Sequence, residues 1–358
     1  MSKKIRVMLI EDSVVVQEML KHIIDIDGRF EVVAVEGSAE GAIARMGQIR
    51  PDVISMDIRL PGMNGLEATL KIMMEYPTPI VVVSDNIQSE DLKISIHALQ
   101  AGALSVVEKP VGLSHADYGK VARRICDQLA AMSTVKVVRQ RILRNLSFLP
   151  RVPPVSNTPV YATRLPFSIL GLVASTGGPQ ALLQILQGLP KEFPLPIAIV
   201  QHITPSFLDS FVSWLGSITA FKAQIALPGE VPRPGIIYLP PVDRHLGMNG
   251  KVWTLLDSPP LSSQKPSGTI LFQGMAKSLG PAGLGVLLTG MGDDGAQGLL
   301  DLKKSGGYTI TEDESTAVVY GMPAVGKAIG GSCESLPLDR IAPRLLDLIS
   351  EQKEARCL

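Results

Sequence analysis

Five polar residues in the first third of the chain stand at the ends of short apolar runs, and their types suit phosphoryl transfer. Glu11 and Asp12 follow one run, Asp57 follows another, Ser84 closes a third and Lys109 follows a fourth. Three carboxylates are the oxygen ligands that Mg2+ prefers, and a lysine and a hydroxyl can meet phosphoryl oxygens. A single Asp before a turn is more often a cap. Five matching positions in order favour a phospho-accepting site at Asp57.

The second half of the chain carries three residues that could hydrolyse an ester or amide. Ser175, His202 and Asp294 each come shortly after an apolar run. Together they could supply a nucleophile, a base and an orienting acid, whatever their chain order. Each also has a plainer explanation: Ser175 as a helix N-cap, His202 as a structural histidine, and Asp293 with Asp294 as a cap of the following helix. Their convergence favours the triad.

Apolar runs that alternate with helical segments must position these residues. Strands that alternate with helices form a parallel sheet, and ligands gather at the carboxyl ends of its strands. Pro179 after two glycines suits the first turn of a helix. The order Ser, His, Asp differs from the usual esterase fold and implies another sheet topology. The strands expected to carry the candidate residues are 5–10, 51–56, 80–83 and one before Lys109, then 167–174, 196–200 and 283–288.

Length and charge indicate two domains joined by a basic linker. A chain of 358 residues with 46% hydrophobic content predicts about two domains, each with its own core. Residues 120–151 hold 8 Lys+Arg against 1 Asp+Glu, and a proline-bearing stretch follows. This segment could bind an acidic partner or nucleic acid, but a solvated basic face is the favoured interpretation. No apolar run reaches the roughly 18 residues of a spanning helix, so we expect a cytoplasmic protein without membrane insertion.

Residues 3–125 resemble the receiver domain of bacterial two-component response regulators, which implies a flavodoxin-like doubly wound parallel sheet. By this resemblance Asp57 is the phosphoacceptor. One departure is Val106-Val107, where most receivers carry an aromatic residue shortly before the lysine. The resemblance further implies phosphoryl sensing by Ser84 and Lys109, and Mg2+ binding by Glu11, Asp12, Asp57 and the Arg59 carbonyl.

Residues 165–358, after a linker at 126–164, resemble the catalytic domain of the chemotaxis protein-glutamate methylesterases, the CheB family, with a second α/β doubly wound fold. The motifs that carry the resemblance are Ser175-Thr-Gly-Gly-Pro, Gln201-His-Ile-Thr-Pro and Leu288-Thr-Gly-Met-Gly-Asp-Asp-Gly. His245 lies in a rim motif outside the triad. Pro266-Ser-Gly-Thr departs from the family pattern. The roles implied are nucleophile Ser175, general base His202, orienting acid Asp294, and Thr176 and Met291 beside the oxyanion.

The resemblances together imply a serine esterase controlled by phosphorylation. Its expected reaction releases methanol from glutamate methyl esters of methyl-accepting chemotaxis receptors, and it would also deamidate receptor glutamines. The expected phosphodonor is a histidine kinase of the CheA type, and the esterase chemistry itself needs no cofactor. The alternative is a phosphorylation-controlled binding module whose second domain does not hydrolyse. A nucleic-acid-binding function is disfavoured, because the second domain is slightly acidic and shows no basic recognition face.

Overall fold

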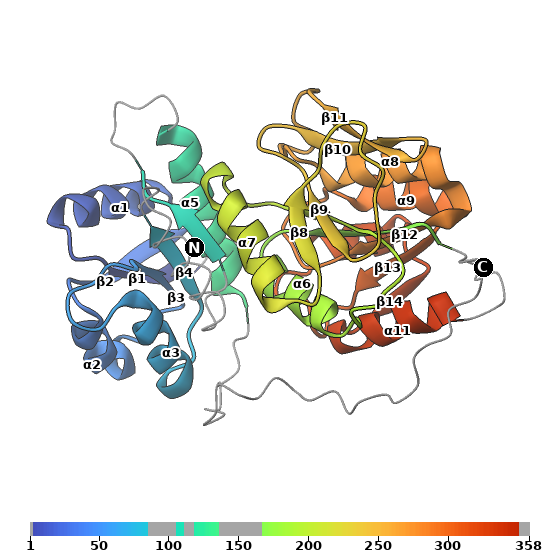
Figure 1. Ribbon diagram of the computed structural model, residues 1–358. Helices are drawn as coiled ribbons and strands as arrows, with labels where there is room; N and C mark the ends of the chain where they lie inside the picture. The colour runs from blue at the N-terminus through green and yellow to red at the C-terminus, as the bar shows by residue number, and fades with distance from the viewer. Residues whose placement is uncertain (1–2, 85–104, 111–117, 136–166, 351–358) are drawn as a thin grey trace. The chain divides into compact units, whose positions relative to one another are not determined.

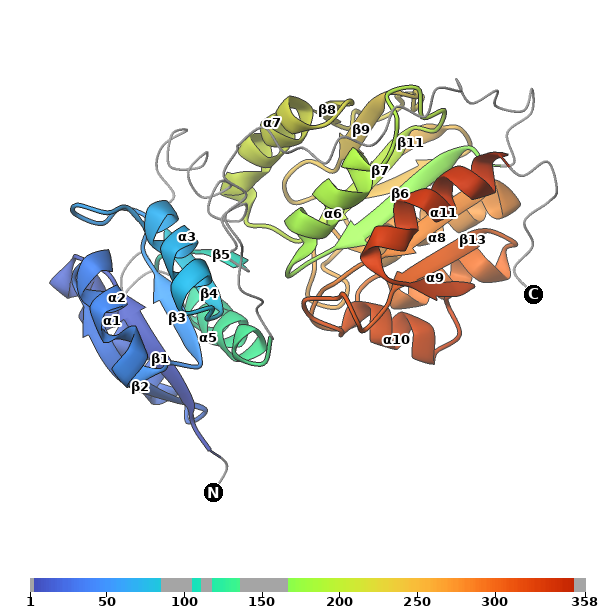
Figure 2. The same cartoon turned by 90° about the horizontal axis from the view of Figure 1, so that it is seen from below.

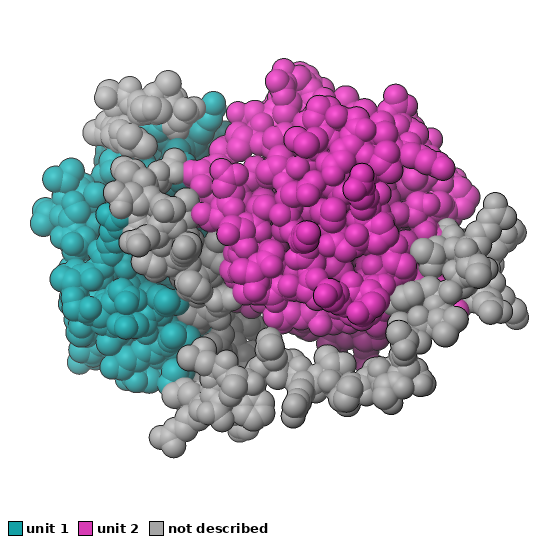
Figure 3. Space-filling view, viewed as in Figure 1, with its two compact units in different colours: residues 1–154 teal, residues 155–358 magenta. Residues whose placement is uncertain are grey.

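The computed structural model describes residues 3–84, 105–110, 118–135 and 167–350. The chain divides into two compact units, residues 1–154 and 155–358, which we call the first and second units (Figure 3). The described residues reach neither the 85–104 segment nor most of the expected linker, so the linker prediction lies largely outside them. Among the described residues, no helix has both the length and the apolar character that a membrane crossing requires.

The first unit is a parallel sheet whose first four strands are joined by helices (Figure 1). Its strand order β2-β1-β3-β4-β5 brings β1 and β3 together at the centre. The strands read as nearly continuous apolar runs, as expected where helices cover both faces of a sheet. The described elements are β1 (Ile5–Ile10), α1 (Val14–Ile26), β2 (Phe30–Glu36), α2 (Ala39–Ile49), β3 (Val53–Met56), α3 (Gly65–Glu75), β4 (Ile80–Ser84), β5 (Ser105–Glu108) and α5 (Tyr118–Ser133).

Local signals in the sequence set the starts of two of these helices. The Ser38 side chain accepts from the amide of Gly41 at the start of α2, and the Asn64 side chain accepts from the amide of Glu67 at the start of α3. Both contacts satisfy amides that have no partner within the helix. Gly65 is required here, because a Cβ at this position would lie 2.2 Å from the carbonyl oxygen of Asp57.

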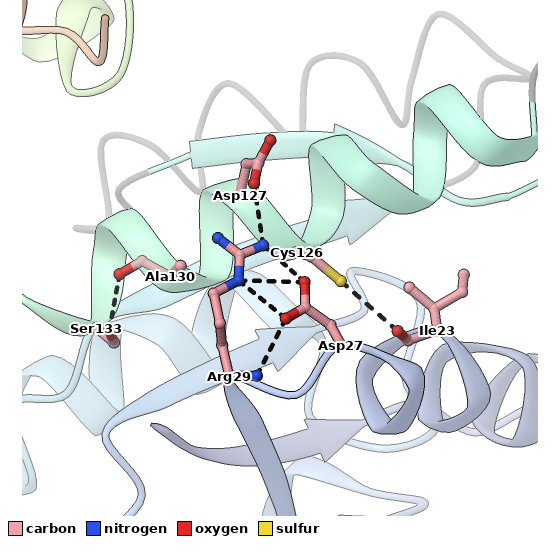
Figure 4. A network of polar contacts seen from close by, with 7 residues as sticks. All are labelled: Ile23, Asp27, Arg29, Cys126, Asp127, Ala130 and Ser133. Atoms are coloured by element: carbon pink, nitrogen blue, oxygen red, sulfur yellow. Dashed lines mark hydrogen bonds and ion pairs between the residues drawn. The ribbon is translucent and has the colours of Figure 1, made fainter. Parts of the chain in front are cut away.

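Helix α5 packs against the start of the first unit (Figure 4). Arg29 pairs with Asp27 at 2.7 Å and with Asp127 of α5 at 3.0 Å, and the Cys126 thiol donates to the Ile23 carbonyl. The helix ends at Ser133, within the range 126–164 expected for the linker. The domain ranges expected from the sequence, 3–125, 126–164 and 165–358, stay a prediction.

The second unit contains a larger sheet in which every pairing is parallel, with the strand order β14-β13-β12-β6-β7-β9-β8. Its elements, from the first strand to the last helix, are β6 (Ile169–Ala174), α6 (Gly178–Gln187), β7 (Ile197–Gln201), η1 (Pro205–Phe207), α7 (Leu208–Ile218), β8 (Lys222–Ile225), β9 (Ile236–Leu239), β10 (His245–Asn249), β11 (Val252–Leu256), α8 (Gly268–Leu279), η2 (Gly280–Ala282), β12 (Gly283–Leu287), α9 (Ala296–Lys304), β13 (Tyr308–Glu312), α10 (Met322–Ala328), β14 (Glu334–Leu336) and α11 (Leu338–Ser350).

Helices cover both faces of this sheet, as predicted for a doubly wound fold. Figure 1 shows α8 and α9 on one face, and Figure 2 shows α6 and α11 lying over the other. The chain fills one side of β6 first, with β7, β8 and β9, and then crosses to the other side through the antiparallel hairpin β10–β11 and α8 to reach β12. Such a reversal of strand order opens a crevice at the carboxyl ends of the strands, where ligands bind in this class of fold.

Candidate active site and regulatory site

The carboxyl ends of β1 and β3 in the first unit bring two buried acids to one buried lysine. The Lys109 ammonium lies 2.8 Å from Glu11 Oε2 and 2.9 Å from Asp57 Oδ2. Glu11 is 1% exposed and Asp57 3% exposed, so all three charges are held out of water. One ammonium cannot neutralise two carboxylates, and the cluster keeps an excess negative charge.

This imbalance shows in the protonation of the two acids. Burial is the largest effect and raises the pKa of Asp57, although Lys109 acts in the opposite direction. The pKa of Glu11 is raised by burial and by the neighbouring Asp57 charge, again against the influence of Lys109. A further cation at the site would relieve both effects, because it would favour the charged forms.

The donor set fits Mg2+. Ligand oxygens of Glu11, Asp12 and Asp57 lie within 4.8 Å of one another, and Asp12 is exposed where the other two are buried. Hard oxygen ligands from one or two carboxylates are what Mg2+ usually takes from a protein. Ser84 is buried at the end of the neighbouring strand β4, and its carbonyl accepts from the amide of Lys109 at 2.9 Å. The contribution of the Arg59 carbonyl stays a prediction.

In the second unit, the sheet brings Ser175 and His202 to adjacent strand ends. Ala174 of β6 pairs with Gln201 of β7, and the His202 amide donates to the Ala174 carbonyl at 3.1 Å. Asp294 comes from the loop after β12, the strand on the other side of β6. His202 Nε2 lies 2.8 Å from Asp294 Oδ2, while His202 Nδ1 is buried without a hydrogen-bond partner among the described residues. The nitrogen left to take a proton is therefore Nδ1.

Asp294 is held by the start of α8. Its carboxylate accepts from the Gly268 amide at 2.7 Å, the Thr269 amide at 3.2 Å and the Ser267 hydroxyl at 2.5 Å. Carboxylates are favoured at the positive end of a helix. The expectation that Asp294 could cap the helix after it is therefore wrong, because its carboxylate satisfies α8, while α9 begins after Gly295 without a side-chain cap.

These donors decide the charge of Asp294. Burial is the largest effect and by itself raises the pKa of Asp294. The hydrogen bond and charge of His202, with the hydrogen bonds from Ser267 and Gly268, together outweigh burial and lower this pKa to about 2. Asp294 is thus a buried carboxylate that stays ionised at neutral pH. An ionised carboxylate on one imidazole nitrogen fixes the orientation of the ring and favours proton uptake at the other.

Ser175 is held through its backbone. The N-cap position of α6 belongs to Gly177, so the interpretation of Ser175 as a plain cap is wrong. The Gln201 amide nitrogen donates to the carbonyls of Ser175, at 2.8 Å, and His202, at 3.1 Å. Gly178 leaves room for this side chain, since a Cβ there would lie 2.0 Å from Gln201 Oε1. Gln201 therefore fixes the two residues relative to each other.

Thr176 and Met291 lie on the two loops that flank Ser175. Thr176 follows it directly, and Met291 follows Gly290, whose added Cβ would lie 2.7 Å from the Cβ of Ser175. The two loops are tied together, because the Thr289 hydroxyl donates to the Thr176 carbonyl at 2.8 Å and the Thr289 carbonyl accepts from the Ser175 amide at 3.0 Å. Thr289 therefore ties the segment of Ser175 and Thr176 to the loop that carries Met291, and the oxyanion role of Thr176 and Met291 stays a prediction.

A buried acid lies behind these loops. Glu312, with no exposed surface, accepts from the Thr289 amide at 2.8 Å and from the Thr316 hydroxyl at 3.1 Å. Burial raises its pKa to about 7 in spite of these two donors. Glu312 thus contacts Thr289, two residues before Met291, without being part of the triad.

A hollow that is partly open to solvent adjoins the loop after His202. Its walls combine proline and aliphatic side chains with a few polar ones. The lining residues are Gln201, Ile203, Thr204, Pro205, Leu208, Leu239, Pro240, Pro241, Val242, Asp243, Lys265 and Pro266.

Sequence reasoning did not assign roles to Gln201, Ser267, Thr289 and Glu312. Gln201 and Thr289 stand at the ends of buried strands, and that position is a signal that could have found them. Ser267 and Glu312 are recognisable only from the fold, because their partners Asp294 and Thr289 lie 27 and 23 residues away in the chain.

Comparisons with known proteins cover both units. A model of the response regulator receiver domain matches residues 7–116, and a model of the CheB methylesterase matches residues 170–345. The chain is 54% identical over 351 residues, 97% of this chain and 98% of the relative, to the protein-glutamate methylesterase/protein-glutamine glutaminase 2 of Paramagnetospirillum magneticum. It is 42% identical over 352 residues, 96% of this chain and 98% of the relative, to the corresponding protein 1 of Syntrophus aciditrophicus.

A solved structure supports the assignment of the second unit. The crystal structure of the Thermotoga maritima CheB methylesterase catalytic domain matches with a TM-score of 0.50 at 35% identity, and the match covers 51% of this chain and 99% of that one. The nearly full-length relatives join the same two parts in one chain. The chain therefore belongs to the CheB methylesterase family, with a response regulator receiver domain ahead of its methylesterase domain.

Proposed function

We propose that this protein is a phosphorylation-regulated serine esterase that hydrolyses glutamate methyl esters on chemotaxis receptors and also deamidates receptor glutamines. The single observation that carries the chemistry is the buried Asp294 bonded to His202 Nε2 at 2.8 Å, with Ser175 at the end of the strand beside that of His202. The names of the nearly full-length relatives supply the substrate class, protein glutamate esters and glutamine amides.

In the proposed reaction, the Ser175 hydroxyl oxygen attacks the ester carbonyl while its proton moves to His202 Nδ1. The tetrahedral intermediate collapses when that proton passes to the methoxy oxygen, and methanol leaves. A water molecule then attacks the acyl-enzyme with His202 again taking a proton, and glutamate is released as Ser175 regains its hydrogen. With a glutamine side chain the same steps release ammonia.

Backbone amides near Ser175 are proposed to stabilise the negative oxygen of both tetrahedral intermediates. The amides of Thr176 and Met291 are suited by their positions on loops that Thr289 joins. Donors that are fixed before the reaction cost no reorganisation when charge develops, and each is worth roughly 3 to 4 kcal/mol.

The receiver domain is proposed to control this activity through phosphorylation of Asp57. The carboxylates of Glu11, Asp12 and Asp57, with the Arg59 carbonyl, would hold Mg2+. When bound, this ion would offset the excess negative charge of the cluster. Lys109, already 2.9 Å from Asp57, and Ser84 are the residues proposed to meet the phosphoryl oxygens. The domain ranges 3–125, 126–164 and 165–358 belong to this proposal.

The partners follow from the two domains. A receiver domain takes its phosphoryl group from a kinase, and we propose a histidine kinase of the CheA type. The proposed substrates are the cytoplasmic helices of methyl-accepting receptors, which would place the protein in the cytoplasm. A binding module without hydrolysis is not favoured, because the family and its named relatives are enzymes.

The test is methanol release from a methylated receptor fragment, measured with and without a small phosphodonor and Mg2+. Ser175→Ala should retain the fold and lose activity by on the order of 10^4-fold or more, because the nucleophile is gone. Ser217→Ala is the matched control, since Ser217 is exposed and its hydroxyl donates within its own helix to Trp214. A folded Ser175→Ala protein within tenfold of wild type would sink the assignment.

A further inference from the structure

His245 is a buried histidine that the proposed reaction does not use. It is the first residue of β10, and none of its surface is exposed. Both of its ring nitrogens have partners. Nδ1 lies 3.0 Å from the backbone amide nitrogen of Ser267, and Nε2 lies 3.2 Å from the Pro259 carbonyl oxygen. A histidine satisfied at both nitrogens holds its neighbours in one arrangement.

The partners of His245 fix its tautomer. The Ser267 amide can only donate, so Nδ1 must offer a lone pair. The ring proton then lies on Nε2 and is donated to the Pro259 carbonyl. In this form the neutral ring is the acceptor for the Ser267 amide, which is buried with the rest of that residue.

Ser267 in turn acts on Asp294. It occupies the N-cap position of α8, yet its side chain makes no cap bond. The hydroxyl donates instead to Asp294 Oδ1 at 2.5 Å. The following amide, that of Gly268, donates to Oδ2, the oxygen that also bonds His202 Nε2. The placement of Ser267 therefore decides how the carboxylate faces the imidazole.

We propose that His245 is a positioning residue for ester hydrolysis, which acts through Ser267 to hold Asp294 against His202. This inference rests on the proposed function. The competing explanation is that His245 only stabilises the β10–β11 hairpin. The two explanations differ in what a substitution changes: the turnover of folded enzyme in the first case, and only the amount of folded enzyme in the second.

The expected effect follows from leaving the Ser267 amide without an acceptor. A buried donor that loses its partner is costly, and the structure relaxes by moving it. A displacement of about 1 Å among catalytic groups can cost on the order of 100-fold in rate. We therefore expect kcat to fall roughly 10- to 100-fold, with KM nearly unchanged because His245 does not touch substrate in this proposal.

Three substitutions of His245 distinguish the loss of the hydrogen-bond acceptor at Nδ1 from a change in side-chain volume. His245→Asn places a carbonyl oxygen at about the position of Nδ1 and keeps the acceptor. His245→Gln reaches towards Pro259 but offers no acceptor at the δ position, and His245→Leu removes both bonds. We expect the Leu and Gln variants to show the loss in kcat, whereas the Asn variant should stay within about threefold of wild type.

The measurement is methanol release from the methylated receptor fragment by the full chain with saturating phosphodonor and Mg2+. Active sites are counted by titration with an organophosphonate, so that kcat refers to folded enzyme. Ser267→Ala is combined with His245→Leu in a double-mutant cycle. If His245 acts through the Ser267 hydroxyl, the Leu substitution should cost less than about threefold when that hydroxyl is absent.

The outcomes are distinct. A Leu variant with wild-type kcat, or single losses that multiply in the double variant, overturns this inference while leaving the proposed function intact. Wild-type protein that releases no methanol overturns both. Should the Leu variant not fold, the Asn and Gln variants decide: a kcat for Asn several-fold above that for Gln supports the positioning role, and equal values overturn it.

Discussion

Asp57 and Asp294 are both buried carboxylates at the carboxyl ends of parallel strands, yet their surroundings shift their protonation in opposite directions. Asp57 shares one ammonium with Glu11, and burial raises its pKa. Within the part of the chain that the structure describes, Asp294 has no acid among its hydrogen-bond partners. It receives a hydroxyl, two helix amides and an imidazole, which overcome burial and lower its pKa to about 2.

The comparison teaches that burial alone does not set the charge of an acid. The number and kind of donors around it decide the outcome. The Asp57 cluster is left short of positive charge, which suits the proposed role of Asp57 in binding a cation and accepting a phosphoryl group. Asp294 is complete as it stands, which suits a residue whose task is to stay charged and hold a ring in place.

The largest expected effect tests whether hydrolysis requires the negative charge of Asp294. Asp294→Asn should reduce methanol release by on the order of 10^4-fold, because a neutral amide neither favours the His202 cation nor keeps the same tautomer. Asp293→Asn is the matched control, as Asp293 is its exposed neighbour, and it should stay within about twofold. Equal rates for the two variants would refute the distinction between these aspartates.

The second prediction tests whether the receiver domain restrains the catalytic domain. A fragment that starts near Arg164 should fold alone, since it exceeds the size at which a core is self-sufficient. If the receiver blocks the site for 99% of the time, the fragment should be about 100-fold faster than the unphosphorylated full chain. Initial demethylation rates at equal concentration check this. A folded fragment no faster than the whole would mean that the receiver activates by another route.

The third prediction tests whether Asp57 is the residue that accepts the phosphoryl group. Asp57→Asn should abolish the rise in esterase rate on addition of phosphodonor and Mg2+, a rise of at most about 100-fold by the same estimate. Asp25→Asn, at an exposed position on α1, should respond as wild type does. The phosphoacceptor is misassigned if the rise survives in Asp57→Asn.

The smallest effect concerns Glu312, a buried acid with too few donors. Its pKa rises from 4.5 to about 7 on folding, so folding favours the protonated form. The resulting stability is complete below pH 4.5 and is lost as pH rises through about 7. Glu312→Gln should remove this dependence, so the difference in free energy of unfolding between this variant and wild type should be about 3 kcal/mol more favourable to the variant at pH 8 than at pH 4.5.

Urea unfolding of the second unit at several pH values measures this difference. Glu314→Gln, two residues on and exposed, should follow wild type throughout. Parallel curves for wild type and Glu312→Gln would show that Glu312 ionises as readily in the folded protein as in the unfolded chain.

Much of this molecule could be predicted from the sequence. Parallel strands buried on both faces leave continuous apolar runs, and polar residues right after them must meet at one edge. For that reason the doubly wound folds are confirmed, and the structure brings Asp57 to Lys109 and His202 to Asp294. These predictions rested on residues that stand next to strand ends in the sequence.

The rest depends on contacts that local sequence does not encode. The hydrogen bonds that hold Asp294 come from Ser267 and Gly268 at the start of α8. The sequence around Asp294 contains no signal that predicts these contacts. The same holds for His245, whose partner Ser267 lies 22 residues away. The capping interpretation of Asp294 failed for this reason, because the helix that follows a residue need not be the one it serves. That of Ser175 failed because Gly177 occupies the N-cap position of α6.

The close fit of Gly178 against Gln201 has a consequence for engineering. A side chain at residue 178 would displace the amide that bridges the carbonyls of Ser175 and His202, so the segment around it cannot be randomised in a search for new specificity. Diversity belongs instead at the solvent-facing Val242 and Asp243, which line the same hollow as Gln201. Substitutions at these two positions would leave the hydrogen bonds of Gln201 to Ser175 and His202 intact.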